Sequence, residues 1–278
     1  MFQADKTEEL VNKAAQLVEQ AKKAGADRCD AVVVRGRSTS VNVRLGKVEG
    51  TDSSEGDSFS LRVFVGNQVA SVNANAGIDA VELAERAVAM ARVSPEDPFA
   101  ALADPETLAK TYDDLDLFDA TEVDAAALTD AALAMEEAAL GVEGVSNSGG
   151  AGASSGMGGL VLVTSEGFTG SYAGTRFGRS VSVIAGEGTM MERDYEFDSR
   201  LYFADLDSPE SIGRSAGNRV VRRVNPRKVD TASGITVILD PRVARGFVGH
   251  LAGAINGAAI ARKTSFLRDK MGQAIMKP

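Results

Sequence analysis

The sequence predicts an α+β protein, with an N-terminal domain of antiparallel strands and flanking helices followed by the beginning of a second domain. Apolar and polar residues alternate along several segments that short glycine-containing turns connect, which is typical of antiparallel strands. Other segments repeat apolar residues every three or four positions, as helices do when they cover one face of a sheet. With 44% hydrophobic and 25% charged residues among 278, the chain has enough apolar side chains for a folded core.

The first two helices are expected on either side of the first group of strands. The first ends near Gly25, because glycine readily adopts the left-handed conformation that ends helices. The second stops at Ser94-Pro95, since a residue that precedes proline disfavours helical backbone angles. The residues predicted to face inward are Leu10, Ala14, Leu17, Val18 and Ala21 in the first helix, and Leu83, Ala84, Ala87, Val88 and Ala91 in the second.

Two further helices are expected later in the chain. The third covers about Glu122–Leu140 and is rich in alanine, with Thr121 or Asp124 as its N-cap. The fourth starts at Ser208-Pro209, because proline suits the first turn of a helix, and runs to about Arg223. The two halves of the chain therefore share a pattern of strands followed by a helix, without a residue-level repeat that would indicate duplication.

Strands are expected in two groups, one near the start of the chain and one after the third helix. In the first group, Gly66-Asn67 is typical of a tight hairpin turn. In the second, Glu166-Gly167 and Gly186–Gly188 are the predicted turns. The predicted strands are Cys29–Arg35, Val41–Leu45, Phe59–Val65, Gln68–Asn73, Leu160–Ser165, Phe168–Ala185 and Thr189–Phe203.

A domain boundary is expected just after Asn225-Pro226, where the character of the sequence changes. We assign residues 1–228 to the N-terminal domain and residues 229–278 to the beginning of a C-terminal domain. This second stretch is predicted to contain a short apolar strand at Ile235–Leu239 and a glycine-spaced helix at about Arg242–Ala261. Because so few residues rarely make an independent domain, we expect a truncated part of a larger one.

Charge and composition exclude several classes of function. The formal net charge of −9 argues against a general attraction to nucleic acid or to an anionic membrane. The single cysteine, Cys29, excludes an internal disulfide, and the single histidine, His250, excludes a site of two or three histidines built by this chain alone. The best membrane-span candidate, between Arg245 and Arg262, is shorter than the roughly 20 apolar residues that a bilayer requires. We expect a soluble, cytoplasmic protein without direct nucleic-acid or membrane partners.

One glycine-rich segment, Gly150–Gly156, resembles a dinucleotide-binding pattern. That mechanism needs a hydrophobic strand before the glycines and a helix after them, so that the helix N-terminus faces the pyrophosphate. Here a polar segment precedes the glycines and a strand follows them. A flexible loop or a glycine-rich strand explains the pattern better.

The segment Glu192–Tyr195 concentrates two carboxylates, a guanidinium and a phenol. Two carboxylates can divide general acid and base roles. On a strand, however, Glu192 and Asp194 share one face, while Arg193 and Tyr195 share the other. Side-chain ladders or a partner-binding edge explain the cluster at least as well, so the sequence leaves the role of Glu192, Arg193 and Asp194 open.

Two other reactive groups have simple structural explanations. Basic residues at the end of the fourth helix complement the helix dipole. The thiol of Cys29 lies in a valine-rich strand, so a buried, inert cysteine is expected. The basic residues are Arg219, Arg222, Arg223, Arg227 and Lys228.

Gly249, Gly253 and Gly257 recur every four residues and would give the expected helix a smooth stripe. Each glycine costs roughly 1 kcal/mol in a helix relative to alanine. Close packing of another backbone, within the fold or across a subunit interface, would compensate for this cost. Arg262 and Lys263 follow in a polar turn and are candidates for the same interface.

One block and several shorter motifs carry a family resemblance. They are Gly249–Ile255 with Arg262–Leu267, Met191–Tyr195, Asn225–Lys228, Asp116–Phe118 and the helix stop Ser94–Pro98. These residues resemble the TldD/PmbA family, historically called modulators of DNA gyrase, and most of all its PmbA (TldE) branch. The resemblance spans nearly the whole chain.

The resemblance implies a two-domain protein that works as a paired TldD–PmbA metallopeptidase, a heterodimer, on small or unfolded polypeptides. In the TldD branch the glycine-spaced helix carries a His-Glu-x-x-x-His zinc motif. The comparable residues here are His250, Leu251 and Ile255, so leucine replaces the glutamate and isoleucine replaces the second histidine. A lone imidazole does not hold zinc. The resemblance therefore implies a non-catalytic subunit with no cofactor of its own, and zinc in a TldD-like partner.

Two functions of different classes are consistent with the sequence. The first is a PmbA-like subunit that lines the substrate channel of a cytoplasmic metallopeptidase. The alternative is a non-enzymatic regulator that binds peptides or proteins in the gyrase pathway. The net charge argues against direct DNA binding but not against binding a protein regulator. The sequence does not identify the peptide substrate.

Overall fold

The computed structural model describes residues 4–75, 77–111, 113–228 and 230–275. The chain divides into two compact units, Met1–Pro226 and Arg227–Pro278. The larger unit contains the whole sheet and four of the helices, and the smaller unit contains two helices.

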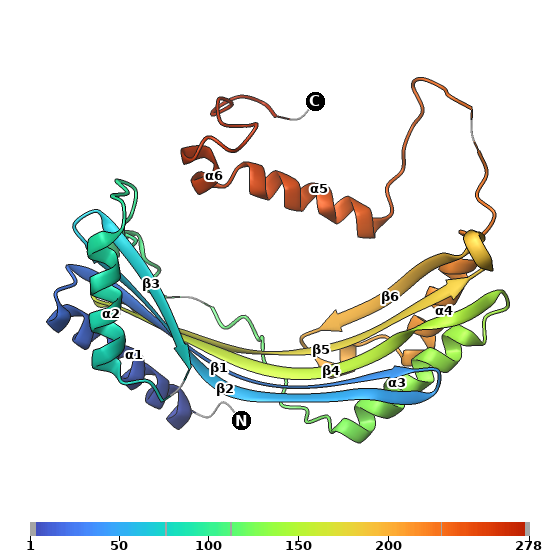
Figure 1. Cartoon of the computed structure of the whole chain (residues 1–278), viewed down its shortest axis with the longest axis horizontal. Helices are drawn as coiled ribbons and strands as arrows, with labels where there is room; N and C mark the ends of the chain where they lie inside the picture. Colours follow the sequence, from blue (N-terminus) through green and yellow to red (C-terminus); the bar gives the residue numbers. More distant parts are fainter. Residues whose placement is uncertain (1–3, 76, 112, 229, 276–278) are drawn as a thin grey trace. The chain divides into compact units, whose positions relative to one another are not determined.

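One six-stranded antiparallel sheet forms the frame of the larger unit (Figure 1). Its strand order is β3-β2-β1-β4-β5-β6, so the two groups of strands join through the neighbours β1 and β4. The α+β fold class is therefore confirmed. The strands are β1 (Arg28–Arg44), β2 (Lys47–Val65), β3 (Gln68–Asn75), β4 (Val145–Thr164), β5 (Thr169–Ala185) and β6 (Glu192–Arg200).

The central strands are longer than the sequence pattern predicts. Two separately predicted strands, Cys29–Arg35 and Val41–Leu45, fall almost entirely within β1. The glycine- and serine-rich stretch before residue 160 likewise belongs to β4 and forms no loop. Pairing on both edges explains the difference, because Gly36 lies opposite Gly56 on one side and opposite Gly158 on the other. Two neighbouring strands hold such residues in a ladder despite their weak β-propensity.

Four helices cover one face of the sheet, two at each end (Figure 1). In β1, Ala31 and Val33 belong to the core at one end, and Val41 and Val43 belong to the core at the other. All four positions are odd-numbered, and alternate residues of a strand share a face, so both cores lie on the same side. These helices are α1 (Ala4–Ala24), α2 (Ala80–Val93), α3 (Ala125–Leu140) and α4 (Pro209–Val221), and short 3-10 turns lie at η1 (Pro105–Thr107), η2 (Gly188–Met190) and η3 (Phe203–Asp205).

The predicted inward faces of α1 and α2 are confirmed, since all ten of the residues assigned to them are buried. The predicted ends are confirmed as well. Gly25 follows α1 with φ +103°, and Asp124 caps α3 by accepting the N–H of Ala127 at 2.8 Å. Ser208 caps α4 by accepting the N–H of Ser211 at 3.2 Å.

The side chain of Glu136 on α3 forms hydrogen bonds that hold the β1–β2 turn. Its side chain is 1% exposed, and its two carboxylate oxygens accept the N–H groups of Leu45 at 2.9 Å and Gly46 at 2.8 Å. The hydroxyl of Ser148 on β4 donates to the same carboxylate. Leu45 has φ 50°, which is rare for a leucine, and the buried carboxylate stabilises this turn through charge-assisted hydrogen bonds.

The smaller unit differs from the sequence-based expectation in two places. It contains α5 (Pro241–Ala254) and α6 (Gly257–Ala261), so the expected single helix over Arg242–Ala261 is wrong. Asn256 interrupts it, because its side-chain oxygen accepts the N–H groups of Ala258 at 3.0 Å and Ala259 at 3.3 Å and thereby caps a new helix. The expected strand Ile235–Leu239 is also wrong: these residues have no regular structure, and no strand in the described part of this unit offers them a partner.

Candidate functional site

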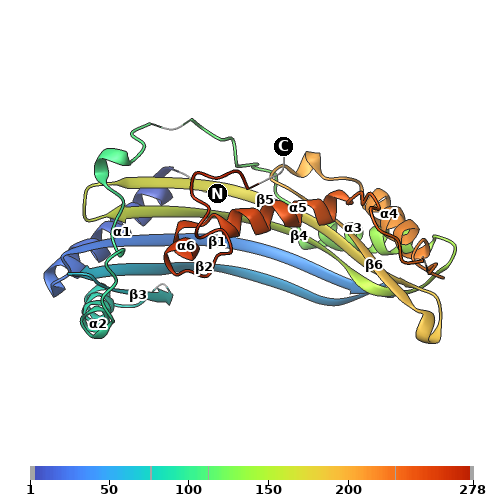
Figure 2. The same cartoon turned by 90° about the horizontal axis from the view of Figure 1, so that it is seen from above.

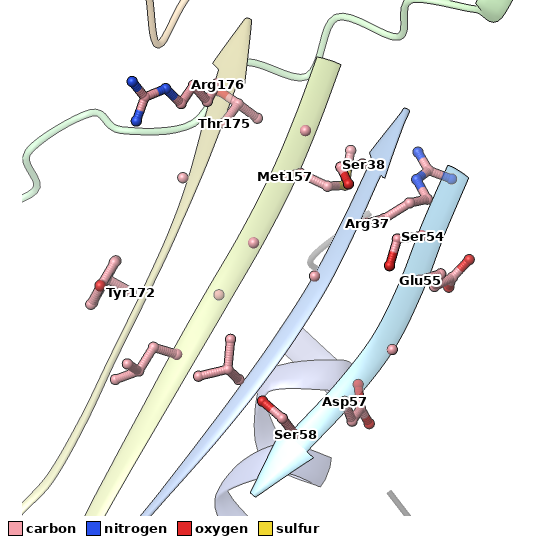
Figure 3. A pocket seen from close by; sticks show the side chains of 18 of the residues that line it. Arg37, Ser38, Ser54, Glu55, Asp57, Ser58, Met157, Tyr172, Thr175 and Arg176 are labelled. Atoms are coloured by element: carbon pink, nitrogen blue, oxygen red, sulfur yellow. The ribbon is translucent and has the colours of Figure 1, made fainter. Parts of the chain in front are cut away.

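The sheet face opposite α1–α4, which we call the open face, carries a hollow of about 940 Å³ over its middle. On β1 this face is formed by Val34, Gly36 and Ser38. Residues of β1, β2, β4 and β5, with Asn75 of β3, line the hollow (Figure 3), and nearly half of them are glycine or serine. Its largest lining side chains are Tyr172 and Arg176 of β5 and Arg37 of β1. The open face is therefore a broad, shallow surface rather than a deep pocket.

Four glycines form a row across the floor of this hollow. Gly56, Gly36, Gly158 and Gly174 are direct neighbours on β2, β1, β4 and β5. Glycine weakens a strand interior and often marks a place where another backbone approaches closely. The row was missed in the sequence, although a signal was available. Gly36 and Gly56 are ten residues from Gly46 on either side, so the hairpin turn aligns them.

One carboxylate that lines the hollow, that of Asp57, is held in an ion pair. The Arg35 guanidinium donates to both carboxylate oxygens of Asp57, at 2.6 and 2.7 Å. This contact holds the pKa of Asp57 below its usual value. Glu9 and Lys13 of α1 join the same cluster. A carboxylate held ionised in this way suits the anchoring of α1 better than proton transfer.

The acidic strand β6 faces two arginines, Arg219 of α4 and Arg223 just after that helix. Arg223 lies 3.4 Å from Glu192 and 3.5 Å from Asp194, and Arg219 lies 2.8 Å from Glu196. Asp194 is buried, at 6% exposure. Carboxylates at every second strand position meet guanidiniums one helical turn apart, so this cluster joins strand to helix. The pairing of these acidic and basic groups was not predicted from the sequence, because the two groups are far apart in the chain.

Cys29 and the dinucleotide-like segment have structural roles. The Cys29 side chain is fully buried, its thiol donates to the carbonyl of Val18 at 3.6 Å, and burial raises its pKa to about 11. The buried position is confirmed, and low reactivity of the thiol is expected from it. Gly150–Gly156 lies inside β4, with no helix after it, so the glycine-rich strand is the correct interpretation.

The residues that resemble a degenerate zinc motif lie at the C-terminal end of α5. His250 is exposed, Leu251 is half-buried and Ile255 is the C-cap residue, 58% exposed. Leucine and isoleucine offer no lone pair to a metal, so these three positions do not fit zinc. In the described part of the chain, no group of three or more His, Cys, Asp or Glu side chains is arranged to hold a metal ion.

The glycine stripe is interrupted in the structure. Gly249 and Gly253 lie on α5, whereas Gly257 begins α6, so the three do not share one helix. A Cβ atom added at any of them would meet no described atom within 4 Å. Arg262 and Lys263 follow α6 and are exposed. Close packing on these five residues remains a prediction.

Solved structures define the class of fold. A candidate modulator of DNA gyrase from Bacteroides thetaiotaomicron superposes with a TM-score of 0.88 at 25% identity, over 99% of this chain and 62% of that one. TldE from Thermococcus kodakarensis superposes with a TM-score of 0.61 at 18% identity, over 74% of this chain and 46% of that one. The fold is thus of the TldD/TldE type.

Sequence comparison gives the family. Models of the PmbA/TldA metallopeptidase match three successive regions: domain 1 at residues 29–91, the central domain at 118–224 and the C-terminal domain at 232–278. The chain is 34% identical to a metalloprotease PmbA homolog of Haemophilus influenzae and 33% identical to metalloprotease PmbA of Escherichia coli O157:H7. These alignments cover 97% and 90% of this chain but 60% and 56% of the two relatives. The chain belongs to the PmbA/TldD family.

Proposed function

We propose that this chain is the PmbA/TldE-like, non-catalytic subunit of a cytoplasmic metallopeptidase. A TldD-like partner would hold the zinc, and the open face would form part of the wall along which small or unfolded peptides pass. The observation that carries the proposal is the replacement of two zinc-motif residues by Leu251 and Ile255 on α5.

Two further observations support a peptide-facing role for the sheet. The row of glycines lets another backbone approach the open face, and the ion pair with Arg35 makes the carboxylate of Asp57 unsuited to proton transfer. No helix in the described part of the chain has the length and hydropathy needed to cross a membrane.

Reconstitution with a TldD-like protein tests the proposal. We expect hydrolysis of a fluorescently labelled, unfolded casein substrate only when both proteins are present, and zinc bound at one equivalent to the TldD-like protein alone. The matched control is His250→Ala in this chain, which should leave the activity of the pair unchanged. Hydrolysis by this chain alone, or zinc that it loses on His250→Ala, would contradict a non-catalytic role.

A second function, a non-enzymatic regulator, is favoured by one observation. A relative of the same fold at 25% identity is described as a candidate modulator of DNA gyrase. If this function applies, the chain should bind a protein of that pathway with the same affinity whether or not a TldD-like protein is present, and reconstitution should yield no peptidase activity.

A further inference from the structure

The outer edge of β5 is only half covered by β6. The β6 strand pairs with Phe177–Ala185, so the first part of β5 extends beyond it. At Thr175 the N–H donates to the carbonyl of Leu117 at 3.0 Å, so the backbone groups of Thr175 point outward, away from β4. In an antiparallel strand every second residue points its N–H and C=O groups to the same side. The same alternation turns the N–H and C=O groups of Ser171 and Ala173 outward. Among the described residues, none forms a backbone hydrogen bond with them on that side.

An apolar hollow of about 860 Å³ lies beside this edge. One wall is the segment 113–118, which runs alongside β5 (Figure 2), and the other comes from β4 and β5. Leu160, Leu162 and Phe168 supply apolar surface. Leu115 and Tyr172 also line the hollow and are 73% and 61% exposed, so two large side chains are exposed to solvent here.

The wall formed by segment 113–118 is strongly acidic. Asp113, Asp114 and Asp116 all line the hollow, and no ion pair joins any of them to another described residue. Tyr202 donates its hydroxyl hydrogen to the carbonyl of Asp116 at 3.0 Å. Hydrogen bonding with the side chain of Asp116, then desolvation and the negative charges of the nearby aspartates, raise the pKa of Tyr202 to about 12.

We propose that residues 169–173 at the outer edge of β5 and the adjacent hollow bind an extended, basic peptide, which adds to the sheet as a further strand. The outward backbone groups of Ser171 and Ala173 would pair with the peptide backbone. The apolar residues would receive its alternate side chains, and the three aspartates would select lysine or arginine. This interaction goes beyond the proposed function, because it requires neither zinc nor a TldD-like subunit.

The other half-covered edge of the sheet does not fit a peptide in the same way. β3 pairs only with residues 58–65 of β2, so the first part of β2 is also open. That edge carries Glu49, Asp52 and Glu55 without an apolar hollow next to it, and charged side chains on an edge strand oppose strand addition. Of the two half-covered edges, that of β5 is the one that lies beside an apolar hollow with aspartates that form no ion pair with other described residues.

Three short peptides of equal length separate strand addition from simple charge attraction. The first alternates valine and lysine, the second alternates valine and glutamate, and the third is the first with its valines replaced by proline. Fluorescence anisotropy with the full chain measures binding, and hydrogen exchange measures protection of the backbone. We expect binding of the first peptide only, with slower exchange at residues 169–173.

Two variants test the two halves of the interaction. Ala173→Pro removes one outward N–H, which an edge strand tolerates, and should weaken binding at least fivefold, whereas Ala173→Ser keeps the N–H and should bind normally. Replacing Asp113, Asp114 and Asp116 together by asparagine should weaken binding about tenfold at low salt. The matched control replaces Glu49, Asp52 and Glu55 by the corresponding amides and should change binding less than twofold. Thermal unfolding of each variant identifies any that fails to fold.

Each remaining outcome overturns the proposal. Equal binding of the lysine and proline peptides would show charge attraction without strand addition. Protection at β2 in place of β5, or no binding at all, would contradict the assigned edge. Protection of residues 169–173 that rises with protein concentration in the absence of peptide would mean that a second copy of the chain covers this edge.

Discussion

At the scale of single residues, Glu136 offers a clear test of what holds the fold together. Its buried carboxylate accepts the N–H groups of Leu45 and Gly46, which no strand partner reaches. We expect Glu136→Ala to lower the free energy of unfolding by about 2–4 kcal/mol, because the buried hydroxyl of Ser148 and the two turn N–H groups would lose their acceptor. Urea unfolding followed by circular dichroism measures this.

The neighbouring Glu137 supplies the control for this experiment. Its side chain is exposed and lies on the same helix, so Glu137→Ala should change stability by less than about 0.5 kcal/mol. Equal losses in the two variants would mean that the carboxylate of Glu136 does not anchor the turn.

The thiol of Cys29 is expected to react slowly in the folded protein. Burial raises its pKa to about 11, so the thiolate that attacks alkylating reagents is scarce at pH 8. We expect less than a tenth of the rate of a free cysteine with iodoacetamide, and full reaction after denaturation in urea. Mass spectrometry follows the modification, and rapid labelling without denaturant would contradict the buried position.

At the scale of elements, the Arg35–Asp57 pair joins β1 to β2 and, through Lys13 and Glu9, contacts α1 in a pH-dependent way. Arg35 lowers the pKa of Asp57, so the stabilisation is fully present above the pKa of an unfolded aspartate and is lost as pH falls through the lower folded value. We expect Asp57→Asn to cost on the order of 1 kcal/mol at pH 7, with the difference from the parent shrinking below about pH 4.

Urea unfolding at a series of pH values checks this prediction, with Asp52→Asn as the control. Asp52 lies on the same strand, is exposed and forms no ion pair with the described residues. A difference for Asp57→Asn that stays constant down to pH 3 would show that the ion pair is not its cause.

The glycine row of the open face is expected to serve binding rather than stability. A Cβ atom at Gly36 would meet only the carbonyl of Met157, at 3.8 Å, and its backbone is not left-handed. Gly36→Ala should therefore raise stability by about 0.5 kcal/mol by restricting the unfolded chain. At Gly46, where φ is +72° and the space is equally open, alanine should instead destabilise by about 1 kcal/mol. Thermal unfolding compares the two, and loss of stability at Gly36 would assign that glycine a structural role.

Element by element, apolar periodicity predicted α1 to α4 well but not the length of the strands. The helices were recognisable because each buries one stripe of its own residues. The middle of β1 and most of β4 lack such a pattern, since their central residues are small or polar and belong to neither core. The candidate hollow was missed for the same reason: its floor is made by residues that cross-strand pairing brings together.

At the scale of the whole molecule, the smaller unit exposes apolar side chains that a larger assembly would cover. Val237, Ile238 and Phe247 are 73%, 91% and 60% exposed, and Gly253 has no described neighbour where its Cβ would be. We expect Gly253→Leu to leave the stability of this chain nearly unchanged, because the added side chain fits into open space.

The same substitution should behave differently in a full-length relative. There, close packing on the glycines would make the leucine variant less stable by roughly 1–3 kcal/mol and weaken partner binding, whereas alanine would be tolerated. Thermal unfolding and binding of a TldD-like protein measure both effects. A leucine variant as stable and as well bound as the parent would show that the glycine positions are merely exposed.

The sequence alone determined the fold class, the inward faces of α1 and α2, the ends of α1 to α4, and the family, because each depends on local periodicity or on contiguous motifs. The tertiary structure decided what depends on pairing across long separations. It joined Gly36 to Gly158 over the floor of the hollow, directed Arg219 to Glu196, and left the outer edge of the first half of β5 without a paired strand. Strand register determines each of these contacts, and register depends on where distant segments meet rather than on any one segment.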